Sequence, residues 1–426
     1  MEREHFSRWL APILSECCRG SPAVFVNGPR QAGKSTLVKE LLEMPFEAAY
    51  ISLDDLTTRA AAENDPIAFL RNYKGSVIID EVQLVPGLFR SIKIVIDELR
   101  HAHRKSANGR FILTGSANVL ALPALSDALV GRMRILTLLP LAMGEYANAT
   151  PVLNELLENG LGIFSGAKQF PIFNLEEWIS CATFPEIALK ASNQQQHQMY
   201  AADWYQDYIT TILQRDVRNL AEIDKLSSMP NLLKVLALRT ASLVNDAAAA
   251  REAGLNAMTY RRYRTLLQHV FLIEMVPPWF RNIGKRLTKS PKLFFYDTGL
   301  LAHLLGVTPL SLKTSQSPLF GHLVENFVAS ELMKQLTLSR RHVLYHYRTD
   351  DGKEVDFVIE SPTGQVTAIE VTAKLSVKAD DFSGMKSLKS AIGKDFKHGL
   401  VLYSGSTAVA FGNDLMAVPI SALMGI

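Results

Sequence analysis

Residues 28–36 decide the fold of the first part of the chain and read Gly28-Pro29-Arg30-Gln31-Ala32-Gly33-Lys34-Ser35-Thr36. They match the phosphate-binding P-loop pattern, in which two spaced glycines precede a lysine and a hydroxyl residue. The stretch follows the β-branched run 23–27 and opens the helical pattern of residues 35–43. A glycine-rich turn between a strand and a helix points backbone N–H groups at phosphate. We therefore predict that residues 28–36 bind the phosphates of ATP.

Two carboxylates complete the predicted phosphate site. The apolar run 77–79 ends in Asp80 and Glu81, which resembles the acidic pair that follows a buried strand in P-loop enzymes. We expect Lys34 to reach the β and γ phosphates, and Ser35 and Asp80 to hold Mg²⁺. Glu81 would orient the attacking water and take its proton. A chance acidic pair and a glycine turn without nucleotide are the alternatives.

Three further side chains are candidates for the same chemistry. Thr114 and Ser116 follow the apolar run 111–113, and we favour Thr114 as the residue that senses the γ-phosphate. Arg132 precedes another strand pattern and could act as an arginine finger on a neighbouring copy of the chain. An ordinary surface arginine is the equal alternative for Arg132. Lys34 is expected to face solvent, so that its replacement leaves the fold intact.

The region around the P-loop alternates short apolar runs with helical patterns, which is typical of an α/β fold with a parallel sheet. Five strands are predicted, and the runs are AVFVNG (23–28), AAYISLD (48–54), SVIID (76–80), RFILTG (110–115) and RILTLLPL (134–141). In such sheets, ligands bind at the carboxyl ends of the strands. The motifs above lie at those ends.

Composition limits the class of protein. Of the 426 residues, 48% are hydrophobic and 20% are charged, which indicates a folded chain of two or three domains. A net charge of +3 is too small to indicate a nucleic-acid or membrane partner. The longest apolar stretches, such as 135–143, are shorter than the roughly 18–20 residues of a membrane span. Three cysteines without disulfide or metal-ligand spacing favour a reducing, cytoplasmic location.

The phrases of this sequence resemble a known family. GPRQAGKST (28–36), SLDD (52–55), VIIDEVQ (77–83), ILTGSAN (112–118) and LVGRM (129–133) are similar to those of the AAA-type ATPases of the AAA_14/DUF4143 family. FPEI (184–187), LQRDV (213–217) and SPKLFFYDTGL (290–300) resemble recurrent phrases of that family's C-terminal half. The resemblance implies an AAA-type ATPase core, a winged helix and a terminal α/β fold similar to the PD-(D/E)XK nucleases.

On this basis we predict four parts of the chain. They are an ATPase core (1–142), a helical lid or connector (143–225), a winged helix-turn-helix (226–305) and a nuclease-like α/β domain (306–426). Basic residues cluster in the predicted winged helix, where both the second helix and the hairpin contact DNA. The candidates for nucleic-acid binding are Arg261, Arg262, Arg264, Lys285, Arg286 and Lys289. A solvated basic face, or a face that docks on the ATPase core, is the alternative.

The nuclease-like part contains three acids where the resemblance implies metal ligands, Glu325, Asp356 and Glu370. Such acids bind a divalent ion that activates water against a phosphodiester. The family's lysine position is occupied here by Thr372, and Lys374 lies two residues further on the same strand face. An active site that uses Lys374 and an inactive, binding-only domain are both left open.

Three functions therefore compete. The first is a Mg²⁺-dependent ATPase that engages DNA through its C-terminal half, and the second is an ATP-gated nuclease. The third is a nucleotide switch that acts on a protein partner. Assembly into a homo-oligomer, with Arg132 acting across the interface, is left open.

Overall fold

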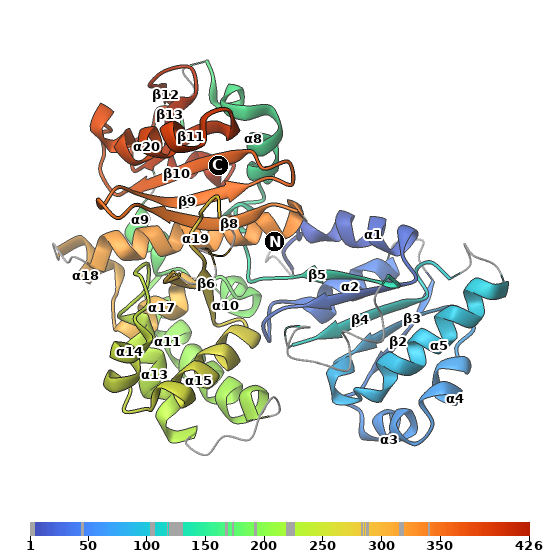
Figure 1. Ribbon diagram of the computed structural model, residues 1–426. Helices are drawn as coiled ribbons and strands as arrows, with labels where there is room; N and C mark the ends of the chain where they lie inside the picture. Colours follow the sequence, from blue (N-terminus) through green and yellow to red (C-terminus); the bar gives the residue numbers. More distant parts are fainter. Residues whose placement is uncertain are drawn as a thin grey trace.

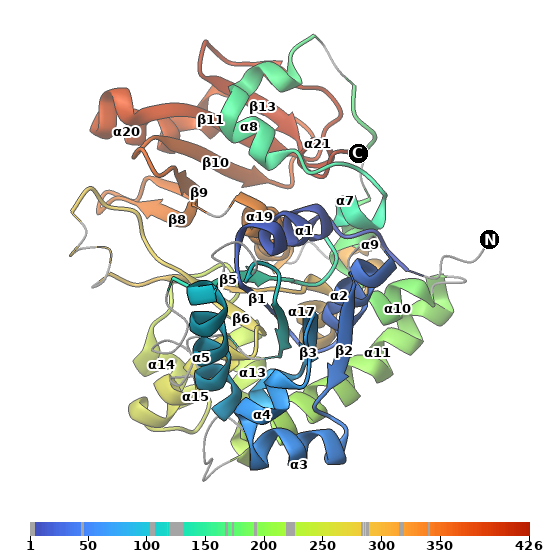
Figure 2. The ribbon, with the colours of Figure 1, turned by 90° about the vertical axis from the view of Figure 1, so that its right-hand side faces the viewer.

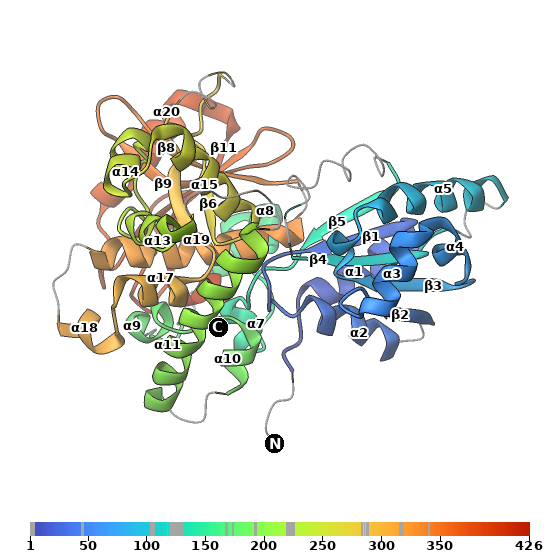
Figure 3. The ribbon, with the colours of Figure 1, turned by 90° about the horizontal axis from the view of Figure 1, so that it is seen from below.

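The computed structural model of the chain forms two units that lie side by side (Figures 1 and 3). We call the five-stranded sheet with helices α1–α5 the N-terminal unit, and everything from α7 onward the C-terminal unit. The described residues are 5–43, 47–102, 107–116, 118, 131–166, 169–172, 174–190, 194–218, 226–282, 284, 286, 289–314, 319–339 and 341–426.

The N-terminal unit is built on the parallel sheet that the sequence predicts. Its strands are β1 (Ala23–Asn27), β2 (Ala48–Ser52), β3 (Ser76–Asp80), β4 (Phe111–Gly115) and β5 (Met133–Thr137). The strand order is β2-β3-β4-β1-β5, and all four neighbouring pairs are parallel. The helices are α1 (Leu10–Gly20), α2 (Lys34–Glu43), α3 (Leu56–Asn64), α4 (Pro66–Arg71) and α5 (Gly87–Ala102).

Helices cover both faces of this sheet, which explains why its central strands are mainly apolar. Successive side chains of a strand point to opposite faces. Val24 and Val26 of β1 pack with α1 and α2, whereas Phe25 packs with α4 and α5 on the other face. Every residue of β1 and β4 is consequently buried.

The C-terminal unit begins with helices that connect it to the sheet. They are α7 (Met143–Tyr146), α8 (Leu153–Asn159), α9 (Leu175–Ile179), α10 (Pro185–Leu189) and α11 (Gln194–Thr211). Two 3₁₀ segments (Gly160–Phe164 and Leu226–Ser228) and a π-helix (Ile212–Val217) complete this part. The predicted helical character of residues 143–225 is thus seen in the residues described.

Three helices and a hairpin follow in the order that suggests a winged helix. They are α13 (Met229–Ala237), α14 (Asp246–Glu252), α15 (Ala257–His269) and the antiparallel pair β6 (Ile273–Val276) and β7 (Lys292–Phe295). Asn245 and Asn256 cap α14 and α15, because their side chains accept hydrogen bonds from the first-turn N–H groups of Ala248 and Thr259. Gly254, with a φ of +68°, makes the turn between them. Assignment as a winged helix stays a prediction.

The remainder forms a mixed sheet between helices. The strands are β8 (Val343–Arg348), β9 (Glu354–Glu360), β10 (Val366–Thr372), β11 (Phe396–Tyr403), β12 (Val409–Ala410) and β13 (Leu415–Pro419). Their order is β12-β13-β11-β10-β9-β8, in which β10 and β11, and β11 and β13, are parallel. The helices are α17 (Thr298–Leu305), α18 (Pro309–Thr314), α19 (Leu319–Ser339), α20 (Ser383–Ile392) and α21 (Ile420–Leu423).

Helix α19 is the centre of the C-terminal unit and runs below the mixed sheet (Figures 1 and 2). It is buried along almost its whole middle, from Leu323 to Gln335. Its polar residues bind other segments: Asn326 bonds the backbone of Phe295 in β7, and Glu331 accepts from the N–H of Met143 at 2.9 Å. Within the described part of the chain, no helix is long and apolar enough to cross a bilayer.

One hydrophobic core runs through the whole C-terminal unit. It joins residues of the connector, such as Leu153 and Tyr205, to Leu267 of α15, Val328 of α19 and Met424. A second core lies on the other face of the mixed sheet, under α20. The predicted boundaries at 142, 225 and 305 stay predictions, and the core itself is continuous across residues 225 and 305.

Alanine substitutions at two glycines on different helices should change the free energy of unfolding in opposite directions. A Cβ at Gly384 of α20 would lie 1.9 Å from the carbonyl oxygen of Glu354, whereas a Cβ at Gly321 of α19 meets nothing within 4 Å. We expect Gly384→Ala to lower the free energy of unfolding by about 2–3 kcal/mol. Gly321→Ala should raise it by about 0.5–1 kcal/mol. Urea denaturation measures both, and equal effects would contradict the close contact of α20 with β9.

Candidate active site

The P-loop takes the conformation that its glycines allow. Gly28 has a φ of +144°, and a Cβ there would lie 2.0 Å from the carbonyl oxygen of Leu138. Gly33 has a φ of +90° at the start of α2. Gln31 also has a positive φ, of 62°, and its side chain is exposed, as is that of Thr36. The loop therefore wraps tightly at the carboxyl end of β1.

Lys34 is buried, with 5% of its surface exposed, so the expectation that it faces solvent is wrong. Its ammonium donates to the carbonyl oxygens of Gly28 and Pro29, at 3.0 and 2.7 Å. Burial lowers the pKa of Lys34 to about 8, although the nearby carboxylates of Glu81 and Asp80 favour the charged form. The loop thus folds around its own lysine.

Asp80 collects three hydroxyl groups at the end of β3. Its carboxylate accepts from Ser35 Oγ at 3.0 Å, from Tyr50 OH at 2.6 Å and from Thr114. Burial raises the pKa of Tyr50, and its hydrogen bond to Asp80 adds to this effect. Ser35 and Asp80, the two predicted metal ligands, are therefore adjacent oxygen donors, which is the ligand type that Mg²⁺ prefers.

Glu81 is held in a left-handed backbone conformation, with a φ of 58°. Such a conformation is uncommon outside glycine and clusters at functional sites. Its N–H donates to Thr114 Oγ1 at 3.1 Å, and its carboxylate accepts from the side-chain amide of Gln83. Gln83 also donates to Ser116 Oγ at 3.2 Å. Thr114 thus contacts both Asp80 and Glu81, whereas Ser116 reaches Glu81 only through Gln83. No motif in the sequence indicates a role for Gln83 or Tyr50.

Arg132 is placed far from these groups in the topology. It precedes β5 and therefore lies at the amino end of the parallel sheet, opposite the P-loop. Its guanidinium forms a two-point ion pair with Asp97 of α5, at 2.7 and 3.1 Å. The structure does not bring Arg132 to the nucleotide site of its own chain, and action on a second copy stays a prediction.

Arg8 braces the P-loop from behind. This buried guanidinium donates to the carbonyl oxygens of Ala32 and Leu139, both at 2.7 Å, and to Glu145 of α7 at 3.1 Å. The connector approaches from the same side, since Pro185 of α10 lies 3.7 Å from where a Cβ of Gly33 would be. The sequence carries no signal for Arg8, because a lone arginine before a helix belongs to no motif.

The basic residues of the predicted winged helix are for the most part ion-paired. Arg261 and Arg264 both contact Asp246 of α14, and Lys289 lies 3.8 Å from Asp350. Arg262 is exposed on α15. Lys285 lies outside the described residues.

Arg286 differs from the other basic candidates. Its guanidinium forms a two-point ion pair with Glu360, at 2.6 and 2.9 Å, and stacks near the rings of Trp279 and Tyr345. Only 13% of its side chain is exposed. Arg286 therefore joins the hairpin loop to β8 and β9, and its role in nucleic-acid binding stays a prediction.

The three acids of the nuclease-like part do come together, but around a lysine. Lys292 of β7 donates to Glu325 at 2.8 Å and to Asp356 at 3.0 Å, and Glu370 accepts from the N–H of Asp356 at 3.3 Å. Burial, followed by the charge of Asp356, raises the pKa of Glu325 to about 8 and that of Glu370 to about 9. Burial disfavours the Lys292 ammonium, yet the carboxylates of Asp356 and Glu325 outweigh this and raise its pKa.

The lysine that meets these acids is thus not the predicted one. Lys374 is 64% exposed and pairs with Asp381 at 2.9 Å, although it lines the same polar hollow as Glu370 and Thr372. Among the residues that the structure describes, no group of three or more acids, histidines or cysteines is arranged to hold a metal ion. The three acids therefore form an ion-pair cluster with Lys292. The sequence does not link Lys292 to these acids, because it lies in β7, which is distant from them in the chain.

Three family profiles match successive parts of the chain. An AAA domain profile (AAA_14) matches residues 20–147, one of unknown function (DUF8612) matches 172–311, and another of unknown function (DUF4143) matches 320–423. The AAA_14 and DUF4143 matches together support an AAA-type ATPase of the AAA_14/DUF4143 family. The phrases at 184–187, 213–217 and 290–300 lie within the DUF8612 match, not within DUF4143 as we expected.

Curated relatives and solved structures are similar along most of the chain. The uncharacterized proteins Rv2008c of Mycobacterium tuberculosis and Mb2031c of Mycobacterium bovis are each 27% identical over 416 residues, which is 97% of this chain and 83% of theirs. The Walker-type ATPase PABY2304 of Pyrococcus abyssi has a TM-score of 0.43 at 15% identity, covering 70% of this chain and 96% of that one. The STAND protein PH0952 of Pyrococcus horikoshii has a TM-score of 0.26 at 13% identity, covering 80% and 51%.

Removal of the buried lysine tests the ion-pair cluster. Lys292→Met should lower the free energy of unfolding by about 3–5 kcal/mol, because it leaves buried carboxylates without their cation. Lys289→Met removes a neighbouring lysine whose pair with Asp350 is exposed, and should change it by about 0–1 kcal/mol. Urea denaturation measures the free energy of unfolding of both variants. Equal changes in the two variants would mean that the acids need no cation.

Proposed function

We propose that this chain hydrolyses ATP in a Mg²⁺-dependent reaction at the P-loop, with Glu81 as the catalytic base. The observation that supports this most is the contact of Ser35 with Asp80 at 3.0 Å, beside a Glu81 held by Thr114 and Gln83. The match of residues 20–147 to an AAA domain profile supports the same reaction. The acids lie at the carboxyl end of the sheet, where open α/β folds bind their ligands.

Each residue of the site has a proposed task. The N–H groups of residues 30–35 would bind the phosphates, and Lys34 would exchange its two carbonyl acceptors for phosphate oxygens, which hold a cation more strongly. Ser35 and Asp80 would hold Mg²⁺, which when bound offsets charge on the phosphates. Thr114 would position Asp80 and the backbone of Glu81, instead of sensing the γ-phosphate directly. Glu81 would accept the proton of the attacking water.

Replacement of Glu81 separates chemistry from binding. Glu81→Gln keeps the shape and the contact with Gln83 but cannot accept a proton, so kcat should fall about 10²–10⁴-fold with little change in KM. Steady-state phosphate release measures this. Glu98→Gln is the matched control on α5, because Glu98 is an exposed acid that pairs with Arg71.

Lys34→Ala tests the other half of the site. It should abolish nucleotide binding while the fold persists, because burial already disfavours the charged lysine and its two partners are carbonyl groups. Circular dichroism and nucleotide binding would be measured on the same sample. A folded variant with unchanged ATP hydrolysis would overturn the proposed site.

We also propose that the C-terminal unit engages DNA through the outer face of α15. Tyr260 and Tyr263 of this helix are buried in the core, which leaves Arg261 and Arg262 on its exposed face. The basic cluster that supports this proposal is smaller than the sequence indicates, because Arg286 is engaged in a largely buried ion pair. Arginines on an exposed helix face bind phosphate with a marked dependence on salt.

The double variant Arg261→Ala, Arg262→Ala tests this surface. Its affinity for duplex DNA should fall at low salt, and the slope of log affinity against log salt should decrease by about 2. Arg71→Ala, Arg90→Ala removes the same charge from exposed positions of the N-terminal unit and serves as the control. Equal affinity in all three proteins would exclude the face of α15 and favour the switch that acts on a protein partner. Mg²⁺-dependent cleavage of the DNA would instead restore the nuclease alternative.

A further inference from the structure

A π-helix lies against the P-loop. It spans Ile212–Val217 at the end of α11 and carries the phrase LQRDV. π-Helical turns are rare and occur frequently at functional sites. Asp216 pairs with Arg30 of the P-loop at 3.4 Å, and Arg215 pairs with Asp54 after β2 at 3.3 Å. One short segment of the C-terminal unit thus contacts two loops at the carboxyl end of the sheet.

Asp216 is an unusual partner for a phosphate-binding loop. It is only 8% exposed, and its Oδ2 atom is buried without a hydrogen-bond partner. Burial raises its pKa, the guanidinium of Arg30 opposes this, and the carboxylate of Glu81 adds to it. The charged or titratable groups that face it are Arg30, Lys34, Glu81, Arg215 and Tyr208. A buried acid is therefore placed where the proposed ligand carries several negative charges.

The consequence is a competition for one arginine. Phosphate oxygens and a carboxylate are alternative partners of a guanidinium, and two anions close together in a protein repel each other. We propose that Asp216 competes with the phosphates of ATP for Arg30, so that nucleotide binding breaks the Asp216–Arg30 pair and displaces the π-helix. This inference rests on the proposed ATP site. It makes Asp216 a positioning residue that reports the state of the P-loop.

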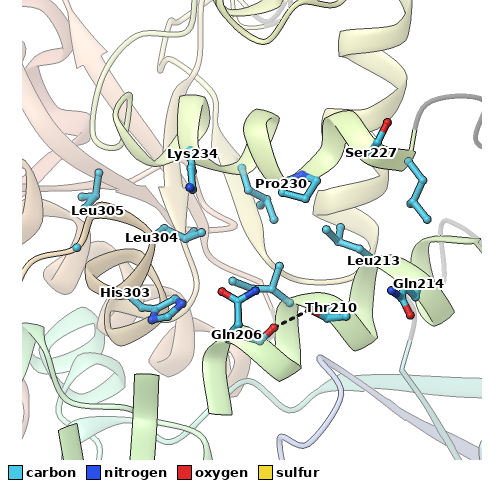
Figure 4. A pocket seen from close by; sticks show the side chains of 14 residues that line it. Gln206, Thr210, Leu213, Gln214, Ser227, Pro230, Lys234, His303, Leu304 and Leu305 are labelled. Atoms are coloured by element: carbon cyan, nitrogen blue, oxygen red, sulfur yellow. Dashed lines mark hydrogen bonds between the residues drawn. The ribbon is translucent and has the colours of Figure 1, made fainter. Parts of the chain in front are cut away.

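The π-helix also borders a pocket of the C-terminal unit. Leu213 and Gln214 line this pocket of about 730 Å³, whose other walls come from α11, from α13, with Pro230 and Lys234, and from α17 (Figure 4). A shift of the π-helix would therefore change its packing against α13 and α17. Since α13 is the first helix of the predicted winged helix, the path from the P-loop to that region is short.

Asp216→Asn is the decisive variant. Removal of the competing charge should tighten the binding of ATP, measured with a fluorescent N-methylanthraniloyl-ATP, by about tenfold at pH 8. Asp203→Asn removes the same charge about three turns earlier on α11, from an exposed position, and should leave the affinity unchanged. Unchanged or weaker ATP binding in folded Asp216→Asn would overturn the proposal, because it would mean that the acid supports the site or is irrelevant to it.

Acidity gives an independent readout. As the pH falls, the wild-type Asp216 takes up a proton and its repulsion disappears, whereas the side-chain amide of the Asp216→Asn variant does not titrate. The ratio of the two dissociation constants should therefore shrink toward 1 as the pH is lowered, and titration of ATP itself cancels in the ratio. A ratio that is constant with pH would contradict an electrostatic competition.

Two further variants separate this inference from the proposed function. In the Arg30→Ala background, Asp216→Asn should tighten binding less than in the wild type, because the shared partner is gone. Additive effects would overturn the competition for Arg30 while leaving the ATP site intact. Lys34→Ala that still binds ATP would overturn the site itself, whatever Asp216 does.

Discussion

The buried guanidinium of Arg8 is the contact on which the arrangement of the two units depends. It bonds the P-loop at Ala32, the chain after β5 at Leu139 and the carboxylate of Glu145 in α7. Glu145 in turn accepts from the backbone N–H groups of Trp9 and Ala142. A buried arginine is tolerated only when its donors are satisfied and its charge is offset. Here the P-loop, the chain after β5 and helix α7 together satisfy the donors and offset the charge of Arg8. The position of the connector and the shape of the P-loop are therefore determined by the same contact.

This arrangement gives the nucleotide site two kinds of neighbour. On one side are rigid groups of the sheet, with Asp80 and Glu81 held by Thr114. On the other side are groups of the C-terminal unit, of which Asp216 contacts the loop through Arg30. The first set fixes the geometry of the catalytic groups. In the second set, Asp216 would be repelled by the negative charge of a bound nucleotide, as proposed above. A division of this kind is what a nucleotide-driven protein needs, because chemistry requires fixed groups and signalling requires an element with two positions.

The sequence alone predicts the parallel sheet, because the patterns that indicate it lie within short stretches of the chain. The P-loop follows a strand and precedes a helix directly in the sequence, and the runs 77–79 and 111–113 are apolar because helices cover both faces of the sheet. Long-range pairings were not accessible in this way. Lys34 was expected in solvent because the pattern does not show that the loop closes on it, and Lys292 could not be linked to Glu325 and Asp356 without the fold. Arg286 could not be linked to its partner Glu360 either, because that residue lies two strands away in the chain.

The continuous core of the C-terminal unit also bears on how the protein is made. The N-terminal sheet uses strands between Ala23 and Thr137, so its pairings become available early during synthesis. The connector, by contrast, packs in one core with residues as late as Met424. The core that contains Leu153 and Tyr205 is therefore complete only after the last residues of the chain have been made. Until then, part of its apolar surface is exposed, and this long stretch is where we would look for a dependence on chaperones in the cell.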